Sequence, residues 1–192
     1  MKIGLLFGSF NPIHIGHLIL GNYMAENAGL DRVWFVVSPL NPFKKSASLL
    51  HHQDRYDLVY LAIGDNYKLQ PCNIEFTLPV PSYTVDTLTY LHEKYPEHEF
   101  SLILGQDNLA TFHKWKNYAQ ILEHYHIYAY PRSGCAHTEL ETHPKVTLTQ
   151  APLLDISATF IRQLIQQGKS IKYLLPEAVE EAILRKGFFR QE

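Results

Sequence analysis

The chain has 192 residues, 46% of them hydrophobic and 19% charged, which is typical of a globular protein with one substantial core. Its 17 Lys and Arg residues against 19 Asp and Glu residues give a net charge of -2, so nothing indicates binding to nucleic acid or anionic lipid through the global field. The two cysteines form no CxxC pair, and no apolar run reaches the roughly 18 residues that span a bilayer. We expect a cytoplasmic protein with reduced thiols.

Short apolar runs alternate with helical patterns along the chain. Residues 2–7 predict a buried strand that ends at Gly8, and residues 16–28 predict a helix that ends at Gly29. Residues 32–38 predict the second strand, which Pro39 stops. The later predicted elements are a helix at 54–63, a strand at 67–72, a helix at 84–94, a strand at 99–104, a helix at 118–124, strands at 126–130 and 146–149, and helices at 157–167 and 177–186.

This alternation predicts an α/β fold with right-handed crossovers, in which helices flank a mainly parallel sheet. We expect a single domain over residues 1–192, with a small helical C-terminal region at about 157–192. The stretch 131–144 is polar and without periodicity, which predicts a flexible loop.

The first predicted strand is followed by GSFNPIHIGH, residues 8–17, at the kind of junction where open parallel sheets bind ligands. The N-terminus of the following helix favours an anion such as phosphate, and Gly8 lets the main chain approach a nucleotide. His14 and His17 are expected to project from the same side of the first turn, where imidazoles can donate hydrogen bonds to phosphate oxygens. Taken singly, each could equally be a solvent-facing histidine at a helix start. Neither GxGxxG nor GxxxxGK[ST] occurs, so a hydride-transfer Rossmann enzyme and a P-loop NTPase are not supported.

A second candidate phosphate element is DISATFIR, residues 155–162, which opens the penultimate helix. Ser157 can cap this helix, while Thr159 and Arg162 lie in its first turn and a half. An Arg here opposes the helix dipole, whereas a bound anion would suit both. The structural alternative is an ordinary Ser cap followed by an exposed Arg.

GSFNPIHIGH resembles the GxFxPxHxGH form of the HxGH motif of the nucleotidylyltransferase superfamily, and DISATFIR resembles its ISxTxIR motif. Ala158 stands where a second Ser is common. The resemblance implies a Rossmann-like nucleotidylyltransferase fold, with the motif histidines on the nucleotide phosphates and the hydroxyls and Arg on the β- and γ-phosphates of ATP. The ATP-binding residues it implies are Gly8, Ser9, Phe10, His14, His17, Gly105, Asp107, Ile156, Ser157, Thr159 and Arg162.

Three middle segments resemble bacterial nicotinate-nucleotide adenylyltransferases. SPLNPFKK, residues 38–45, is similar to their PxxPPHK region, with Phe43 in place of the usual His. PSYTVDTL, residues 81–88, matches PSYTxDTL, where Ser82 and Thr84 are plausible caps and the helix N-terminus could hold a carboxylate. GQDNLATFHKW, residues 105–115, has their GxD…W arrangement, which places the Trp against the nicotinate ring. The nicotinate-nucleotide site that the resemblance implies comprises Asn11, Lys44, Tyr83, Thr84, Trp115 and Arg132.

The resemblance implies adenylyl transfer from ATP to nicotinate mononucleotide, which yields nicotinate adenine dinucleotide and pyrophosphate in NAD biosynthesis. We expect His14, His17, Lys44 and Arg162 to act catalytically, through positioning and charge neutralisation during in-line attack. Mg²⁺ is expected to arrive with ATP, without a metal site of the protein itself. The expected partners are these small molecules, with no nucleic acid or membrane, and homo-oligomerisation stays open.

Several alternatives remain at this point. The acceptor could be nicotinamide mononucleotide or phosphopantetheine, although enzymes for the latter lack the PSYTxDTL and GxD…W pairing. A non-catalytic nucleotide sensor would not need His14, His17 and Arg162 intact. A histidine metal site at His51, His52 or His113 is a further alternative, but their spacing suits no standard ligand set. The preference for acid over amide is the least determined part.

Overall fold

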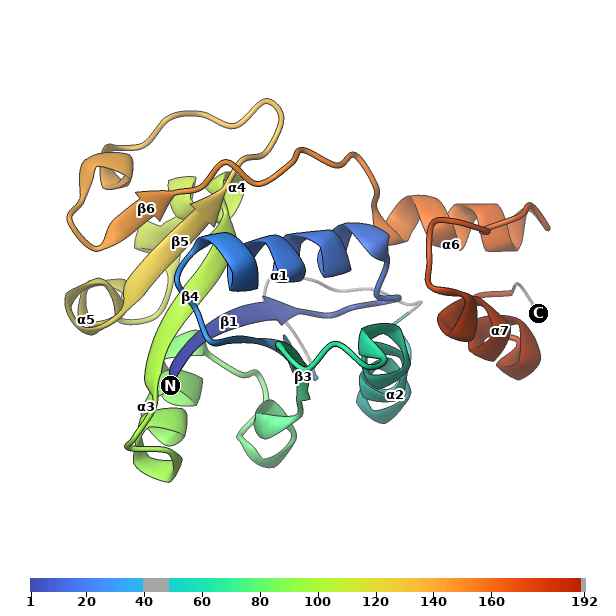
Figure 1. Cartoon of the computed structure of the whole chain (residues 1–192), viewed down its shortest axis with the longest axis horizontal. Coiled ribbons are helices and arrows are strands. Elements are labelled where there is room, and N and C mark those ends of the chain that lie inside the picture. The colour runs from blue at the N-terminus through green and yellow to red at the C-terminus, as the bar shows by residue number, and fades with distance from the viewer. Residues whose placement is uncertain (40–48, 191–192) are drawn as a thin grey trace.

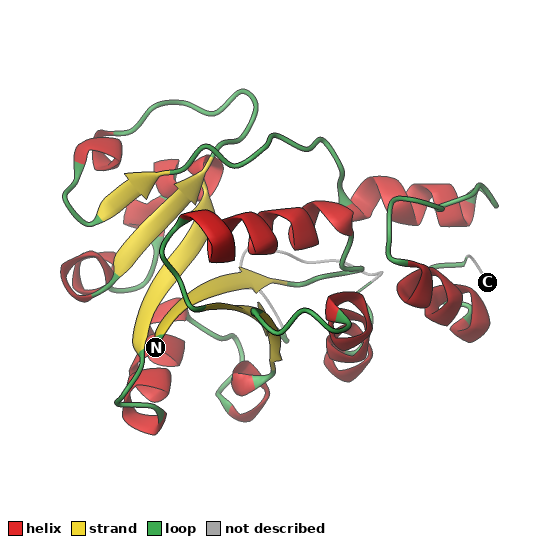
Figure 2. Cartoon of the chain, viewed as in Figure 1, coloured by secondary structure: helices red, strands yellow, loops and turns green. Residues whose placement is uncertain are grey.

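A computed structural model describes residues 1–39 and 49–190, and its centre is a parallel β-sheet with helices on both faces (Figures 1 and 2). The sheet has six strands in the order β3-β2-β1-β4-β5-β6, and every neighbouring pair is parallel. The strands are β1 (Lys2–Gly8), β2 (Arg32–Val37), β3 (Leu69–Cys72), β4 (Glu99–Gly105), β5 (His126–Tyr130) and β6 (Val146–Leu148). The predicted α/β class with a Rossmann-like parallel sheet is confirmed.

The predicted helices are found with ends that differ by two residues or fewer. They are α1 (Ile15–Asn27), α2 (His52–Ile63), α3 (Thr84–Lys94), α5 (Tyr118–His124), α6 (Ala158–Gln166) and α7 (Glu177–Lys186), joined by the shorter α4 (Gln106–Ala110) and by the 3-10 helices η1 (Ile74–Thr77), η2 (Phe112–Lys114) and η3 (Glu139–Thr142). No helix within the described part of the chain is both long and apolar enough to cross a membrane.

The helix η3 lies within residues 131–144, for which the sequence predicts a flexible loop, so this stretch is not without secondary structure. The Leu140 N–H donates to the Thr138 hydroxyl at 3.5 Å, which caps the turn, and the Leu140 side chain packs against the core. An apolar anchor of one residue gives no periodicity, so the sequence pattern did not reveal it.

Strand β2 shows how the sheet buries both faces. Val33 and Phe35 belong to one core cluster, with residues of α1, α2, α6 and α7, while Trp34 and Val36 belong to the other, with residues of α3 and α5. This alternation follows from the two-residue period of a strand, and the continuous apolar run follows from coverage on both faces.

The strand order reverses between β1 and β4. From β1 the chain continues to β2 and β3 on one side, and from β4 it continues to β5 and β6 on the other. The connections that leave the carboxyl ends of β1 and β4 therefore diverge, and open α/β sheets bind ligands in the crevice so formed.

Helices α6 and α7 lie at the end of the sheet toward which β1 points (Figure 1). Ile161 and Val179 are buried in the same cluster as Phe35 of β2. The Ile15 N–H donates to the Leu174 carbonyl at 3.0 Å, which joins the start of α1 to the segment between α6 and α7. The C-terminal helices thus reach the carboxyl end of the sheet, where DISATFIR meets the first loop.

Candidate functional site

A cavity of about 570 Å³ opens at the carboxyl ends of β1 and β4. It brings together Gly8 and Ser9 of the first loop, Tyr83 and Thr84 at the start of α3, and Trp115 after η2. Residues predicted to bind the nucleotide and residues predicted to bind the acceptor therefore share one cavity. The rest of its lining is Leu6, Phe7, Ser38, Glu75, Ser82, Leu102, Ile103, Leu104, Asn108, Lys114, Lys116 and Tyr130.

Trp115 is partly buried, and its ring centroid lies 5.0 Å from that of Phe112, a fully buried core residue. The indole therefore rests on the core while it also lines the cavity. A ring held in this way is a rigid platform on which a flat heteroaromatic ligand can stack.

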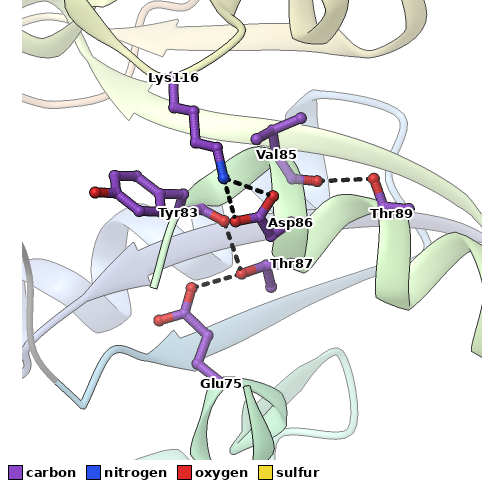
Figure 3. Close-up of polar contacts among 7 residues, drawn as sticks. All are labelled: Glu75, Tyr83, Val85, Asp86, Thr87, Thr89 and Lys116. Carbon is purple, nitrogen blue, oxygen red and sulfur yellow. Dashed lines mark hydrogen bonds and ion pairs between the residues drawn. The ribbon is translucent and has the colours of Figure 1, made fainter. Parts of the chain in front are cut away.

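The start of α3 carries a polar network that the sequence analysis did not find (Figure 3). The Thr87 hydroxyl donates to the buried Glu75 carboxylate at 2.8 Å and lies 3.3 Å from the Tyr83 carbonyl. Burial raises the pKa of Glu75, and hydroxyls of Thr87, Ser38 and Ser82 partly offset this. An acidic residue between the apolar Ile74 and Phe76 was the available sequence signal.

The capping prediction for this helix is wrong. Tyr83, in an extended conformation, is the N-cap of α3, and its side chain makes no cap hydrogen bond. Ser82 instead lines the cavity with its hydroxyl buried, and Thr84 is the first helical residue. Turn chemistry alone did not distinguish the three neighbouring positions.

His14 and His17 lie together, as predicted, with ring centroids 3.7 Å apart and an interplanar angle of 32°. His14 is the N-cap of α1 rather than a residue of its first turn. Its main-chain N–H donates to His17 Nδ1 at 3.3 Å. A Cβ at Gly16 would lie 3.1 Å from the His14 ring, so glycine gives that ring its place. Burial, assisted by Arg132, lowers the pKa of His14 to about 4, which makes it neutral at pH 7.

Gly8 and Phe10 have a structural relation that the motif did not reveal. A Cβ at Gly8 would lie 2.8 Å from the Phe10 ring, which is buried and packs 5.6 Å from Phe35. The side chain of Phe10 is therefore part of the core, so its predicted contact with a nucleotide would have to come from its main chain.

The two motifs predicted to bind phosphate meet through Arg162. Its Nη1 donates to the Asn11 carbonyl at 2.7 Å across 151 residues of sequence, and its Nη2 donates to the Thr159 hydroxyl at 3.2 Å. Ser157 caps α6 as predicted, since its hydroxyl accepts from the Phe160 N–H at 3.1 Å. Ile156 lies beside Gly16 of the first motif. Helix α6 therefore places a guanidinium and two hydroxyls next to the segment 8–17, called the histidine loop below.

Asp107 and Arg132 lie together at the carboxyl ends of β4 and β5, with Asp107 Oδ1 and Arg132 Nε 3.9 Å apart. The Arg132 guanidinium also lies 5.3 Å over the Tyr130 ring. A Cβ at Gly105 would collide with the Asp107 carboxylate and approach Arg132 Cγ at 3.2 Å. Glycine at this position therefore leaves room for these two side chains to converge.

Arg55 organises the loops around the cavity and was missed by the sequence analysis. Its side chain is fully buried and donates to four carbonyls, those of Ser9 at 2.6 Å, Ser38 at 2.8 Å, and Pro39 and Leu50 at 2.9 Å each. Burial lowers its pKa to about 10, so it stays protonated at neutral pH. Its position on the apolar stripe of α2 was the sequence signal.

The remaining predicted residues divide into two groups. Lys44, with Phe43, lies outside the described residues. The rings of His51 and His52, at the start of α2, have centroids 4.0 Å apart and are tilted by 34°, and His113 lies in η2. Across residues 1–39 and 49–190, no group of three His, Cys, Asp or Glu side chains is placed to hold a metal ion.

Comparison with known proteins agrees with this geometry. Residues 5–164 match the family model described as cytidylyltransferase-like. Two curated relatives, each named "Probable nicotinate-nucleotide adenylyltransferase", are 59% identical over 98% of both chains (Cytophaga hutchinsonii) and 55% identical over 100% of both chains (Flavobacterium johnsoniae).

Among solved structures, nicotinic acid mononucleotide adenylyltransferase of Plasmodium falciparum complexed with NaAD superposes with a TM-score of 0.82 at 19% identity. The match covers 98% of this chain and 97% of the other, and at that identity it shows the fold. The fold, the order of the motifs and the curated relatives, which share more than half of their residues with this chain, all indicate the same family. The chain belongs to the cytidylyltransferase-like family of nucleotidyltransferases, in the group whose members are named nicotinate-nucleotide adenylyltransferases.

Proposed function

We propose that the protein transfers AMP from ATP to nicotinate mononucleotide, with release of nicotinate adenine dinucleotide and pyrophosphate. The observation that carries the proposal is the meeting of three parts in one crevice. These are the histidine loop, the Arg162 guanidinium bound to that loop, and the cavity lined by Tyr83 and Trp115. The names of the curated relatives, and the Plasmodium falciparum structures complexed with NaAD and with APC, support it.

In this proposal a phosphate oxygen of the acceptor attacks the α-phosphorus of ATP, and the bond to the pyrophosphate leaving group breaks. His14 and His17 donate hydrogen bonds to the phosphates, while Thr159 and Arg162 hold the β- and γ-phosphates with Ser157 at the helix start. Positioning and charge neutralisation supply the catalysis, so no covalent intermediate with the protein is needed. Lys44 keeps its proposed role at the phosphates.

The acceptor is proposed to place its pyridine ring on Trp115, with Tyr83, Thr84 and Arg132 around it. Asn11 keeps its proposed place in the acceptor site and also holds the site together. Its carbonyl accepts from Arg162, and its side-chain oxygen accepts from the Leu50 N–H at 3.1 Å. Gly105 and Asp107 serve the nucleotide side.

Divalent metal, Mg²⁺ in this proposal, is carried by the triphosphate, whose oxygens and water satisfy its preference for octahedral oxygen ligands. We further propose that residues 1–192 act as one domain, since side chains of α6 and α7 share a core with the sheet. The domain is proposed to act in the cytoplasm. Partners other than the small-molecule substrates are not part of the proposal.

The test is turnover by the purified protein with ATP and Mg²⁺, supplied separately with nicotinate mononucleotide, nicotinamide mononucleotide and phosphopantetheine. Pyrophosphate and the dinucleotide product are measured, with a reaction lacking acceptor as the control for ATP hydrolysis. We expect nicotinate adenine dinucleotide from the first acceptor. No turnover with any acceptor would refute the enzyme, and preference for the amide would refute the acceptor.

A further inference from the structure

We propose that Lys116 selects the acid over the amide form of the acceptor. It does so by holding its ammonium beside the aromatic wall, formed by Tyr83 and Trp115, that is proposed to receive the pyridine ring. The inference rests on the proposed function and deepens it. The two acceptors differ in the group on the pyridine ring, which is an anionic carboxylate in one and a neutral amide in the other. A fixed positive charge near that group therefore discriminates between them.

The position of Lys116 follows from its neighbours. It succeeds Trp115 in the sequence and lines the same cavity. Its Nζ lies 4.7 Å from the centroid of the Tyr83 ring, the second aromatic residue of this wall (Figure 3). The ammonium thus lies over the ring of Tyr83, one of the two aromatic residues proposed to contact the pyridine ring, in the cavity that Trp115 also lines.

Asp86 fixes the ammonium at this position. Its two carboxylate oxygens lie 2.9 Å and 3.2 Å from Lys116 Nζ, and it belongs to the first turn of α3. The ion pair joins α3 to the segment after η2, so the ammonium is held at the N-terminal end of a helix. That end carries positive partial charge, which offsets part of the repulsion between the Asp86 carboxylate and an anionic ligand.

Among the described residues, the other charged side chains that line the cavity are Glu75 and Lys114. Glu75 is buried, its Oε1 accepts from the Thr87 hydroxyl, and it lies on the opposite side of the Tyr83 main chain from Lys116 (Figure 3). Side-chain exposures of 45% for Lys116 and 50% for Asp86 leave the pair accessible to solvent and to a ligand. Water screens a charge at this exposure, so we expect selectivity of about tenfold from it rather than thousands.

The experiment compares kcat/KM for nicotinate and nicotinamide mononucleotides in the wild type and in Lys116→Met, which keeps most of the length of the side chain without the charge. We expect the acid-to-amide ratio to fall about tenfold, mainly through a higher KM for the acid. Lys116→Arg keeps the charge and should retain the ratio. Where amide turnover is too slow, its inhibition constant against the acid replaces kcat/KM.

Lys94→Met is the matched control, because it removes the same charge from the far end of α3, about 12 Å along the helix from Asp86. It should leave the ratio unchanged. An unchanged ratio in Lys116→Met, an equal loss with both acceptors, or a larger effect of Lys114→Met would each overturn the inference and leave the proposed function standing. Absence of turnover of the acid by the wild type would overturn both.

Discussion

His14 and His17 belong to one motif, but the fold gives them different environments. His14 is 5% exposed and its ring is enclosed by the α1 start and Gly16, whereas His17 is partly exposed and packs edge-on against Phe10 at 5.1 Å. The more accessible ring is better placed to follow charge that develops on a phosphate during reaction.

We therefore expect His17→Ala to lower kcat by about 100-fold or more, since it removes one hydrogen-bond donor to the transferring phosphates. The fold should persist, because the lost cap interaction with the His14 N–H is worth about 1 kcal/mol. Turnover and thermal unfolding measure the two effects separately. His92→Ala, at an exposed position late in α3, is the control and should change neither. Undiminished turnover in His17→Ala would contradict the role of the motif.

The pKa of His14 also predicts how stability depends on pH. An unfolded His titrates near 6.5, whereas burial lowers the pKa of His14 to about 4 in the folded state. Between these values the unfolded chain binds a proton that the folded chain does not, so stability falls as the pH drops from about 6.5 toward 4. Above about pH 6.5 His14 is neutral in both the folded and the unfolded state, so it does not change the stability.

His14→Gln should remove this contribution. Between pH 7 and pH 4.5 we expect the wild type to lose about 2 kcal/mol more of its unfolding free energy than the variant, without nucleotide present. Urea unfolding at the two pH values measures the difference. Parallel profiles of the two proteins would show that burial of His14 is not linked to folding.

At the scale of elements, local patterns predicted helices and strands well because each one buries an apolar stripe or run with its own period. The same patterns said little about side chains whose partners are distant in sequence. Arg55 contacts Ser9, Ser38 and Pro39, and nothing within α2 reveals those carbonyls. Motifs located His14 and Arg162, but their junction through Asn11 is visible only in the fold.

Arg55→Met should destabilise the protein by about 3 to 5 kcal/mol, because it leaves four buried or partly buried carbonyls without their donor. It should also weaken ATP binding, since the Ser9 carbonyl belongs to the first loop. Urea unfolding and nucleotide titration measure these effects. Arg185→Met, at an exposed position of α7, removes the same group and should stay within about 0.5 kcal/mol of the wild type. Equal stability of the two variants would refute the role of Arg55 in holding these loops together.

At the scale of the whole molecule, the sheet is expected to be most stable at its centre. β1 and β4 have partners on both sides, whereas β6 has three residues and one partner strand, and its Leu148 is 43% exposed. Hydrogen exchange followed by mass spectrometry should show the slowest exchange in β1 and β4 and faster exchange in β6. Equal protection of β6 and β1 would contradict this order.

The hydrogen bond between Asn11 and Arg162 has a consequence for protein synthesis. The two residues are 151 positions apart, and a ribosome that adds 5–20 residues per second delivers them roughly 8–30 s apart. During that interval the nascent chain carries the histidine loop without the guanidinium that binds it. In the proposed function Arg162 binds the phosphates of ATP, so the nucleotide site is complete only when α6 has been made and has packed. We therefore expect ATP to bind the finished protein and not its translation intermediates.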